Sequence, residues 1–255
     1  MNTIITIARN TFKETIRDRI LYSVTFLGIL YMIFIFFLST ISLDQGPRVV
    51  TDFGLVGILF FGIAISIFIG ANLLYKEIIG GTALILFPKP ISKMQYIIGK
   101  FFGLTCTIIL VSLILTIIFI AGFWLQNHKW PQIIVYETIV FSILEILIIV
   151  ALTILFGSFS NPISSSLYSL ALFLVGHSYS LIVRTATMGG NKFVIGLSKV
   201  IYYIFPNLEK FNLRIYAVHD IAVSSGELLS GFIYAVIYIT FLLFVATVAL
   251  KKREF

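Results

Sequence analysis

Six long apolar runs constrain this chain more than any other feature of its sequence. A helix of 18 or more apolar residues, at 1.5 Å rise per residue, is long enough to cross the roughly 30 Å hydrocarbon core of a bilayer. The runs cover approximately residues 20–43, 54–75, 97–123, 133–156, 163–184 and 228–250, and all six prolines fall outside them. Because 59% of the residues are hydrophobic and only 11% are charged, a soluble fold would expose large apolar patches. The sequence therefore predicts an all-α integral membrane protein with six transmembrane helices.

Positive charges are distributed unevenly among the segments that join these runs. Eleven of the 18 lysines and arginines lie in the N-terminal segment, in the connection after the second run, or in the C-terminal tail. Cytoplasmic loops carry an excess of such charges. We therefore expect both termini in the cytoplasm of a multi-pass protein of the plasma (inner) membrane. The net charge of +7 suits the anionic lipids of the inner leaflet, so no nucleic-acid partner is needed to explain it.

Residues 1–19 are predicted to form an interfacial amphipathic helix. Apolar residues recur every four positions from Ile4 to Ile20. The segment also carries four cations, the first three of them on an adjacent face: Arg9, Lys13, Arg17 and Arg19. Such a helix lies along the membrane surface, with its apolar face in the acyl boundary and its cations toward lipid phosphates. The simpler alternative is a polar leader before the first span. Residues 20–255 are expected to form the six-span domain.

The segment between the second and third spans, residues 76–96, combines charges with strong helix breakers. A helix can continue from the second span through Ile79, but the glycine pair at positions 80 and 81 favours a break. The prolines at 88 and 90 then prevent helix continuation. Ser92 and Gln95 have the spacing of a capping box for the next helix. These signals predict a short, rigidly bounded element at the cytoplasmic surface, which suits the transmission of force from a partner.

Several short motifs occur in and around this segment. They are Arg17-Asp18-Arg19, Lys76-Glu77 followed by Gly81-Thr82, Lys89-Pro90-Ile91-Ser92-Lys93, Gly99-Lys100, and the stretch from Phe205 to Asn212. Together these motifs resemble the permease subunits of type-2 ABC exporters (ABC-2 type), above all those of multicopper-enzyme maturation and sodium export. The resemblance covers most of the chain. It implies a bacterial permease that pairs with a second permease, as a homodimer or heterodimer, and with two copies of an ABC ATPase subunit.

In that family the loop between spans two and three forms a coupling helix that docks in a cleft of the ATPase subunit. The resemblance implies an ATPase-coupling role for Lys76, Glu77, Gly80, Gly81, Thr82, Lys89, Pro90, Ser92 and Lys93. ATP and Mg would bind to the partner ATPase, because this chain lacks the GxxxxGK[ST] pattern of a P-loop. No cofactor, metal site or catalytic residue is expected in the chain itself.

Three ionisable residues within the apolar runs are candidates for the translocation pathway. Glu145 lies 12 residues past the start of the fourth run, about 18 Å along a helix and near the midplane. A carboxylate there must face a cavity, find a partner or stay protonated. It either lines the path or binds a cation, or it is a protonated hydrogen-bond donor between helices. Glu137 and His177 are expected at similar depths, so they are a candidate pair; a structural role for His177 is the alternative.

Two connections complete the predicted organisation. Residues 157–160, followed by Asn161-Pro162, are predicted to form the turn that joins spans four and five. Residues 185–227 are expected to be an extracytoplasmic segment, with a helix near residues 193–204 at the outer interface. That segment either gates an exit, docks a partner or caps the bundle.

These features favour the membrane permease of an ATP-driven exporter. The few intramembrane charges suit a lipid-like or hydrophobic cargo, whereas the resembling family also includes exporters of ions and cofactors. A stand-alone secondary transporter is the first alternative, but such proteins often contain internal repeats with matched breaks, which this sequence does not show. An intramembrane enzyme is the second alternative. Its candidate residues, Glu145, Ser158 and His177, are scattered and lack a recognisable catalytic spacing.

Overall fold

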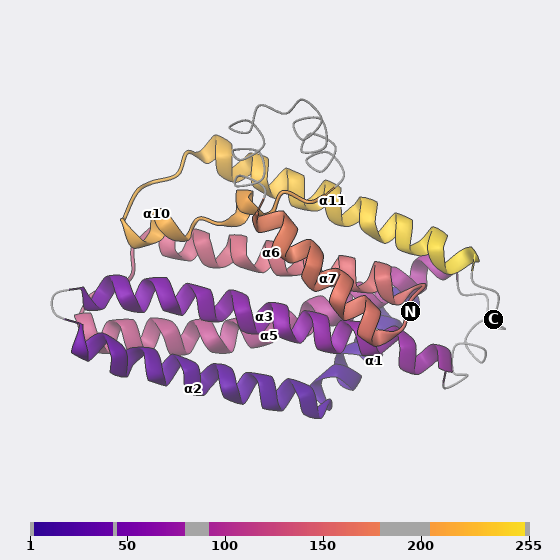
Figure 1. The fold of residues 1–255 in the computed structure, drawn as a ribbon, viewed down its shortest axis with the longest axis horizontal. Helices are drawn as coiled ribbons and strands as arrows, with labels where there is room; N and C mark the ends of the chain where they lie inside the picture. Colours follow the sequence, from indigo (N-terminus) through magenta and orange to yellow (C-terminus); the bar gives the residue numbers. More distant parts are fainter. Residues whose placement is uncertain (1–2, 43–44, 80–91, 179–204, 253–255) are drawn as a thin grey trace, which may run out of the picture.

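The computed structural model describes residues 3–42, 45–79, 92–178 and 205–252. All regular structure in this part of the chain is helical (Figure 1). Five of its helices are long and apolar enough to cross a membrane: α2 (Arg19–Ile41), α3 (Gly46–Ile79), α5 (Lys93–Asn127), α6 (Ile133–Gly157) and α11 (Ser225–Lys252). The prediction of an all-helical, multi-pass membrane protein is confirmed at this level.

The predicted span over residues 163–184 differs from the structure. Helix α7 (Pro162–His177) begins where the sequence predicts, but it has only 16 residues, or about 24 Å. It is therefore shorter than the roughly 30 Å hydrocarbon core, and residues 179–184 lie outside the described part of the chain. The other five predicted spans correspond to α2, α3, α5, α6 and α11, and most of these helices continue beyond the apolar runs into the polar flanks, whereas α2 ends at Ile41, before the predicted end of its run.

Helices α3 and α6 form the centre of the bundle. Within the most apolar 18-residue stretch of each of these two helices, 67% of the residues are buried. The corresponding share is 22–28% in α2, α5 and α11. Helix α3 contacts α2, α5, α6 and α7, whereas α6 contacts α3, α5, α7 and α11. The outer helices turn large apolar side chains away from the bundle, as Phe26 and Phe37 of α2 do, and such surfaces suit contact with acyl chains.

Helices α6 and α11 run in the same direction. Figure 1 shows both starting near α10 (Arg214–Val218) and ending near α1 (Thr3–Ile16). Gly231, in the second turn of α11, lies against Phe141 of α6: a Cβ added to this glycine would be 2.6 Å from the phenyl ring. The chain between α6 and α11 must therefore travel back along the bundle, and α7 covers the first part of that path.

Helix α1 packs lengthwise against α5. Thr11 and Thr15 are each 1% exposed, and the hydroxyls of Thr15 and Thr107 are 2.6 Å apart. Two glycines of α5 allow the close approach, because a Cβ at Gly99 or Gly103 would lie only 2.5–2.7 Å from atoms of α1. This spacing of small residues is typical of close contacts between membrane helices.

The predicted N-terminal helix is present, although it ends at Ile16 and Asp18 caps the next helix through the Ile20 N–H, 3.0 Å away. Its packed face centres on threonines, with the predicted apolar row from Ile4 to Ile20 half-buried beside them. All four cations are exposed: Arg9, Lys13, Arg17 and Arg19. The observed helix and its exposed cations agree with those predicted from the sequence. The placement of α1 in the membrane interface stays a prediction.

The predicted coupling segment is flanked by α3, which is described through Ile79, and by α5, whose predicted start after Ser92 is confirmed. Helix α3 continues through Ile79, so Lys76 and Glu77 belong to its last turns. Ser92 and Gln95 form the predicted capping box, in which the Ser92 hydroxyl accepts from the Gln95 N–H (3.1 Å) and the Gln95 amide oxygen accepts from the Ser92 N–H (3.2 Å). The remaining coupling residues, Gly80, Gly81, Thr82, Lys89 and Pro90, lie outside the described residues.

Lys93 connects this end of the bundle to α11. Its ammonium donates a hydrogen bond to the carbonyl of Leu250, 3.1 Å away. The predicted turn between α6 and α7 lies at the same end, where Asn161 caps α7 by accepting from the Ser164 N–H at 2.8 Å. The beginning of α5, the end of α11, α1 and the α6–α7 turn therefore lie at the same end of the molecule.

Candidate functional site

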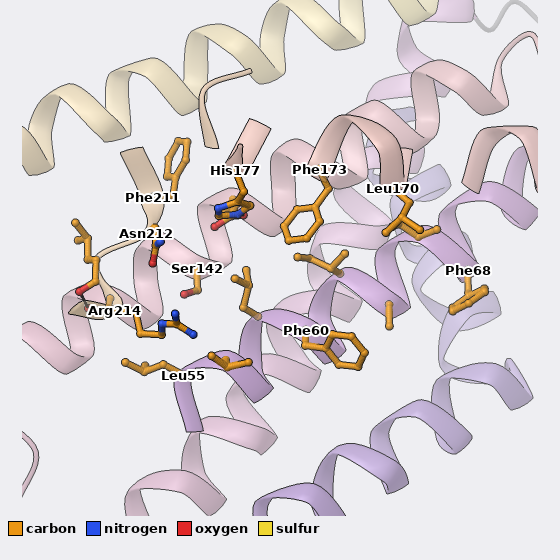
Figure 2. Close-up of a pocket in the computed structure, with 18 residues that line it drawn as sticks. Leu55, Phe60, Phe68, Ser142, Leu170, Phe173, His177, Phe211, Asn212 and Arg214 are labelled. Atoms are coloured by element: carbon orange, nitrogen blue, oxygen red, sulfur yellow. Dashed lines mark hydrogen bonds and ion pairs between the residues drawn. The ribbon is translucent and has the colours of Figure 1, made fainter. Parts of the chain in front are cut away.

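A cavity of about 400 Å³ lies between α3, α6 and α7 (Figure 2). Helix α3 lines it with residues at four-residue spacing from Leu55 to Phe68, a length of about 20 Å. Residues 211–214 close one end. Most of the wall is apolar, and its polar members are Thr138, Ser142, Glu145, His177, Asn212 and Arg214.

Polar and apolar residues occupy different parts of this cavity. Figure 2 shows Asn212 and Arg214 near one end, and Leu170 and Phe68 near the other. Phe60, Phe68 and Leu170 are 63%, 52% and 43% exposed, so the apolar part of the wall reaches the outer face of the described bundle. The cavity is therefore suited to a molecule with one polar and one apolar part, able to enter from the side of the bundle.

Glu145 and His177 meet at the wall of the cavity. Glu145 is 1% exposed, and its Oε1 is 2.5 Å from Nε2 of His177, the last residue of α7. Phe173, one turn earlier on α7, packs edge-on against the imidazole with the ring centroids 4.8 Å apart. The costly burial of a carboxylate is thus offset by a direct partner.

The partner of His177 differs from the predicted one, Glu137. Glu137 is two turns earlier on α6, about 12 Å from Glu145 along the helix axis, and lines no part of the cavity. Counting depth from opposite ends of the two spans places Glu137 and His177 at similar heights. Residues 158–161 form a tight turn between α6 and α7, so the distance along each helix is better counted from this turn. That distance is about 18 Å to Glu145 and 30 Å to Glu137 on α6, and about 22 Å to His177 on α7.

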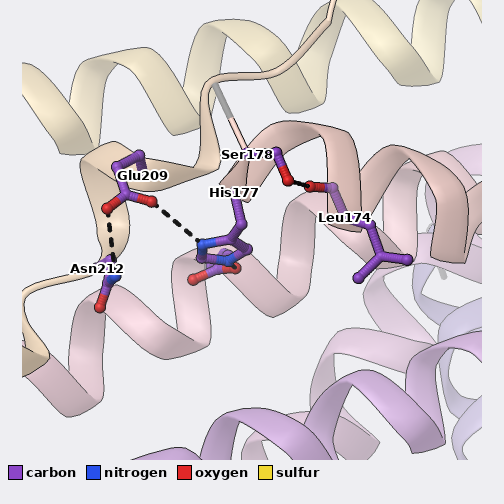
Figure 3. A network of polar contacts seen from close by, with 6 residues as sticks. Leu174, His177, Ser178, Glu209 and Asn212 are labelled. Carbon is purple, nitrogen blue, oxygen red and sulfur yellow. Dashed lines mark hydrogen bonds and ion pairs between the residues drawn. The ribbon is translucent and has the colours of Figure 1, made fainter. Parts of the chain in front are cut away.

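A second carboxylate approaches His177 from the opposite side (Figure 3). Oε2 of Glu209 is 3.5 Å from Nδ1 of His177, and 39% of the Glu209 side chain is exposed. Glu209 belongs to the short 3-10 helix η1 (Leu208–Phe211) and accepts a hydrogen bond from the Asn212 amide at 3.4 Å. Both nitrogens of the imidazole thus face carboxylates, one buried in the cavity wall and one partly exposed.

Close packing holds η1 in this position. Leu208 and Phe211 are 0% and 1% exposed. A Cβ on Gly176 of α7 would lie 2.7 Å from Leu208 and 2.9 Å from the carbonyl of Pro206, so the glycine permits the contact. In the described part of the predicted extracytoplasmic segment, Leu208 and Phe211 therefore pack into the bundle, and residues 211–213 line the cavity.

Charge pairing also stabilises the end of the cavity. Nε of Arg214 is 3.2 Å from Oδ1 of Asp52, near the start of α3. Both side chains are about 40% exposed, so the pair contributes only about 0–1 kcal/mol. It does, however, attach α10 to α3. Neither the Arg214–Asp52 pair nor the contact of Glu209 with His177 was predicted from the sequence, because the partners are distant in the chain, although Glu209 belongs to the stretch from Phe205 to Asn212 singled out above.

Two acceptors in the cavity wall have no partner among the described residues. The Ser142 hydroxyl makes no hydrogen bond there, and Glu145 uses only Oε1. By contrast, the Thr138 hydroxyl is satisfied by the carbonyl of Ile134 at 2.7 Å. Ser142 and Glu145 are 6% and 1% exposed, and both residues line the cavity.

The fold and this site define a helical, multi-pass membrane protein with an internal cavity of mixed polarity. The sequence matches no protein-family model, and no curated protein matches it. The likeness of its motifs to type-2 ABC permeases therefore stays a resemblance.

Proposed function

We propose that this chain is the permease subunit of an ATP-driven type-2 ABC exporter of the bacterial plasma membrane. The observation that carries the proposal is the way in which α5 is connected. This helix directly follows the predicted coupling segment, packs along α1, and is hydrogen-bonded through Lys93 to the end of α11. A force applied by an ATPase to residues 80–91 would thus be transmitted to three helices together.

We propose that the chain crosses the membrane six times, with both termini in the cytoplasm. The directions of α6 and α11 support this number of crossings. Because α6 and α11 run in the same direction, the chain between them must cross the bilayer once more. We propose that this fifth crossing contains α7. His177, the last residue of α7, would then lie near the depth of Glu145.

The cavity is proposed to belong to the translocation pathway. An ionisable residue inside a membrane protein commonly marks a pathway or binding site, and here the buried Glu145 lines a cavity of drug-sized volume. Rearrangement of α3 and α5 on ATP binding would change the wall formed by α3. The complete exporter would contain a second permease, of the same or a related sequence, and two ATPase subunits that bind ATP and Mg.

Co-purification tests the pairing with an ATPase. The tagged chain is isolated from its native membrane in mild detergent, and associated proteins are identified by mass spectrometry. We expect a P-loop ATPase at about one copy per permease. A matched variant in which a glycine-serine linker of equal length replaces residues 80–91 should insert normally and lose the ATPase. Isolation of the intact protein without any P-loop protein would contradict the proposal.

The coupling residues make a more specific prediction. Replacing Gly81 or Glu77 should uncouple ATP hydrolysis from transport, because both would alter the orientation of the docking element, while membrane insertion remains normal. The measurement is substrate-stimulated ATPase activity of the purified complex. Full stimulation in both variants would rule out the coupling assignment.

A proton-coupled secondary transporter is the second candidate, favoured by one observation. Glu145, His177 and Glu209 form a continuous chain of titratable groups from the cavity wall to a partly exposed side chain, and such chains act as proton relays in transporters. Proteoliposomes that contain only this chain would distinguish the two. Uptake or release driven by a pH gradient without an ATPase would favour the secondary transporter.

A further inference from the structure

We propose that the cavity binds an apolar organic amine, whose ammonium group donates hydrogen bonds to Glu145 and Ser142 while its apolar part lies along α3 and α7. The inference deepens the proposed function by naming the class of cargo, and it rests on that function only for the statement that the bound molecule is transported.

The charges around Glu145 favour a cation. Two carboxylates, Glu145 and Glu209, flank a single imidazole. Even a doubly protonated His177 would leave this group of three with one excess negative charge. Arg214 also lines the cavity, but its charge is compensated by Asp52 at 3.2 Å. A ligand with one positive charge would restore neutrality at the buried carboxylate.

The unpartnered acceptors favour a cation that carries N–H donors. The Ser142 hydroxyl and Oε2 of Glu145 accept no hydrogen bond from the described residues, although both residues are more than nine-tenths buried. Residues at i and i+3 lie on one face of a helix, so a single ammonium can contact both.

The remaining wall favours an organic molecule over a bare metal ion. Hard divalent cations such as Ca²⁺ take 6–8 oxygen ligands, whereas this cavity is lined mainly by aromatic and aliphatic side chains. Phe173 lies beside the His177 ring, where an aromatic face can contribute to cation binding. The apolar wall runs for about 20 Å along α3, which accommodates an alkyl chain.

The test measures binding of tritiated dodecylamine to the chain alone in lipid nanodiscs, with empty nanodiscs subtracted. Unlabelled dodecylamine should displace the probe at least about tenfold better than dodecanol or dodecanoate, which share its chain but lack the ammonium. Dodecyltrimethylammonium, which has the charge but no N–H donor, should fall between them. Equal displacement by the alcohol or the carboxylate would overturn the proposal, since it would indicate general filling by lipid-like chains.

Variants identify the site independently. Glu145→Gln keeps the side-chain shape and should weaken dodecylamine binding by about 30-fold or more, because a buried charge partner is lost. Ser142→Ala should weaken it by about 3- to 10-fold through one lost hydrogen bond. The control is Ser169→Ala, which removes a buried hydroxyl of α7 outside the cavity and should leave binding unchanged. Unaltered affinity in Glu145→Gln, eluting as the wild type does in size-exclusion chromatography, would refute the site.

The two proposals can fail separately. Dodecylamine binding is measured without an ATPase, so its loss would leave the co-purification result intact. A chain that binds the amine but no P-loop protein would retain the site and lose the exporter assignment.

Discussion

The contact between α1 and α5 allows one prediction to be worked out in detail. In Gly103→Ala, the new Cβ would lie 2.5 Å from Cβ of Thr11 and 2.7 Å from the carbonyl oxygen of Ala8. Ordinary contacts at such a position begin near 3.4 Å. The Ala8 atom is backbone, so a rotamer change cannot relieve the contact and α1 must retreat by nearly 1 Å.

Three energies determine the result. Overpacking of this kind costs about 1–3 kcal/mol. Retreat of α1 would also lengthen the 2.6 Å contact between Thr15 and Thr107, losing a hydrogen bond of about 1 kcal/mol. Alanine is favoured over glycine inside a helix by about 1 kcal/mol. The net destabilisation is therefore about 1–3 kcal/mol, or a decrease in Tm of about 2–12 °C if the scaling for soluble proteins of 150–250 residues holds.

Thermal stability of the detergent-solubilised protein, followed by fluorescence-detected size-exclusion chromatography, measures this effect. Gly226→Ala is the matched control, because a Cβ there meets only the Ser224 hydroxyl at 3.9 Å and it also lies in a helix. Its Tm should be unchanged or slightly higher. If Gly103→Ala were as stable as Gly226→Ala, α1 would not be closely packed on α5.

Two further predictions concern topology and the cavity. The topology test uses a variant in which Cys106, which is exposed on α5, is replaced. In this background a cysteine at Lys89 should react with membrane-impermeant maleimide only from the cytoplasm, and a cysteine at Lys129 only from outside. Reaction of both from one side would exclude the proposed orientation. Gly176→Ala should displace η1 through its contacts at 2.7 and 2.9 Å and increase the reactivity of a cysteine at Glu209, whereas unchanged reactivity would show that η1 is not held by this contact.

Much of the fold follows from local signals in the sequence. The apolar runs predict five of the helices, the capping box at Ser92 predicts where α5 begins, and Asn161-Pro162 predicts where α7 begins. Each of these signals involves residues within a few positions of each other, so the sequence alone contains the relevant geometry. The short α7 was not predicted, because apolar composition continues beyond His177 and does not indicate where the helix stops.

The site was only partly predictable. Glu145 and His177 were recognised separately because a charge in an apolar run is conspicuous, but their pairing depends on the hairpin register. Glu209 approaches from the short 3-10 helix η1, which packs against Gly176, and Arg214 begins the short helix α10, so neither position follows from a long periodic pattern. Gly99 and Gly103 could have been recognised from their four-residue spacing, and they also provide a structural reason for the Gly99-Lys100 motif, since Lys100 is 3% exposed and 3.7 Å from Glu14.

The pairing of α1 with α5 also has a consequence for the order of assembly. The two threonines that meet across this contact are 92 residues apart, which a ribosome adds in about 5–20 s at typical rates of synthesis. Throughout that interval α1 has emerged without the surface on which it finally packs, and its threonine face stays hydrated or in contact with lipid headgroups. Helix α1 can therefore reach its native position only after α5 has been inserted, and protease protection of α1 during translation would report that event.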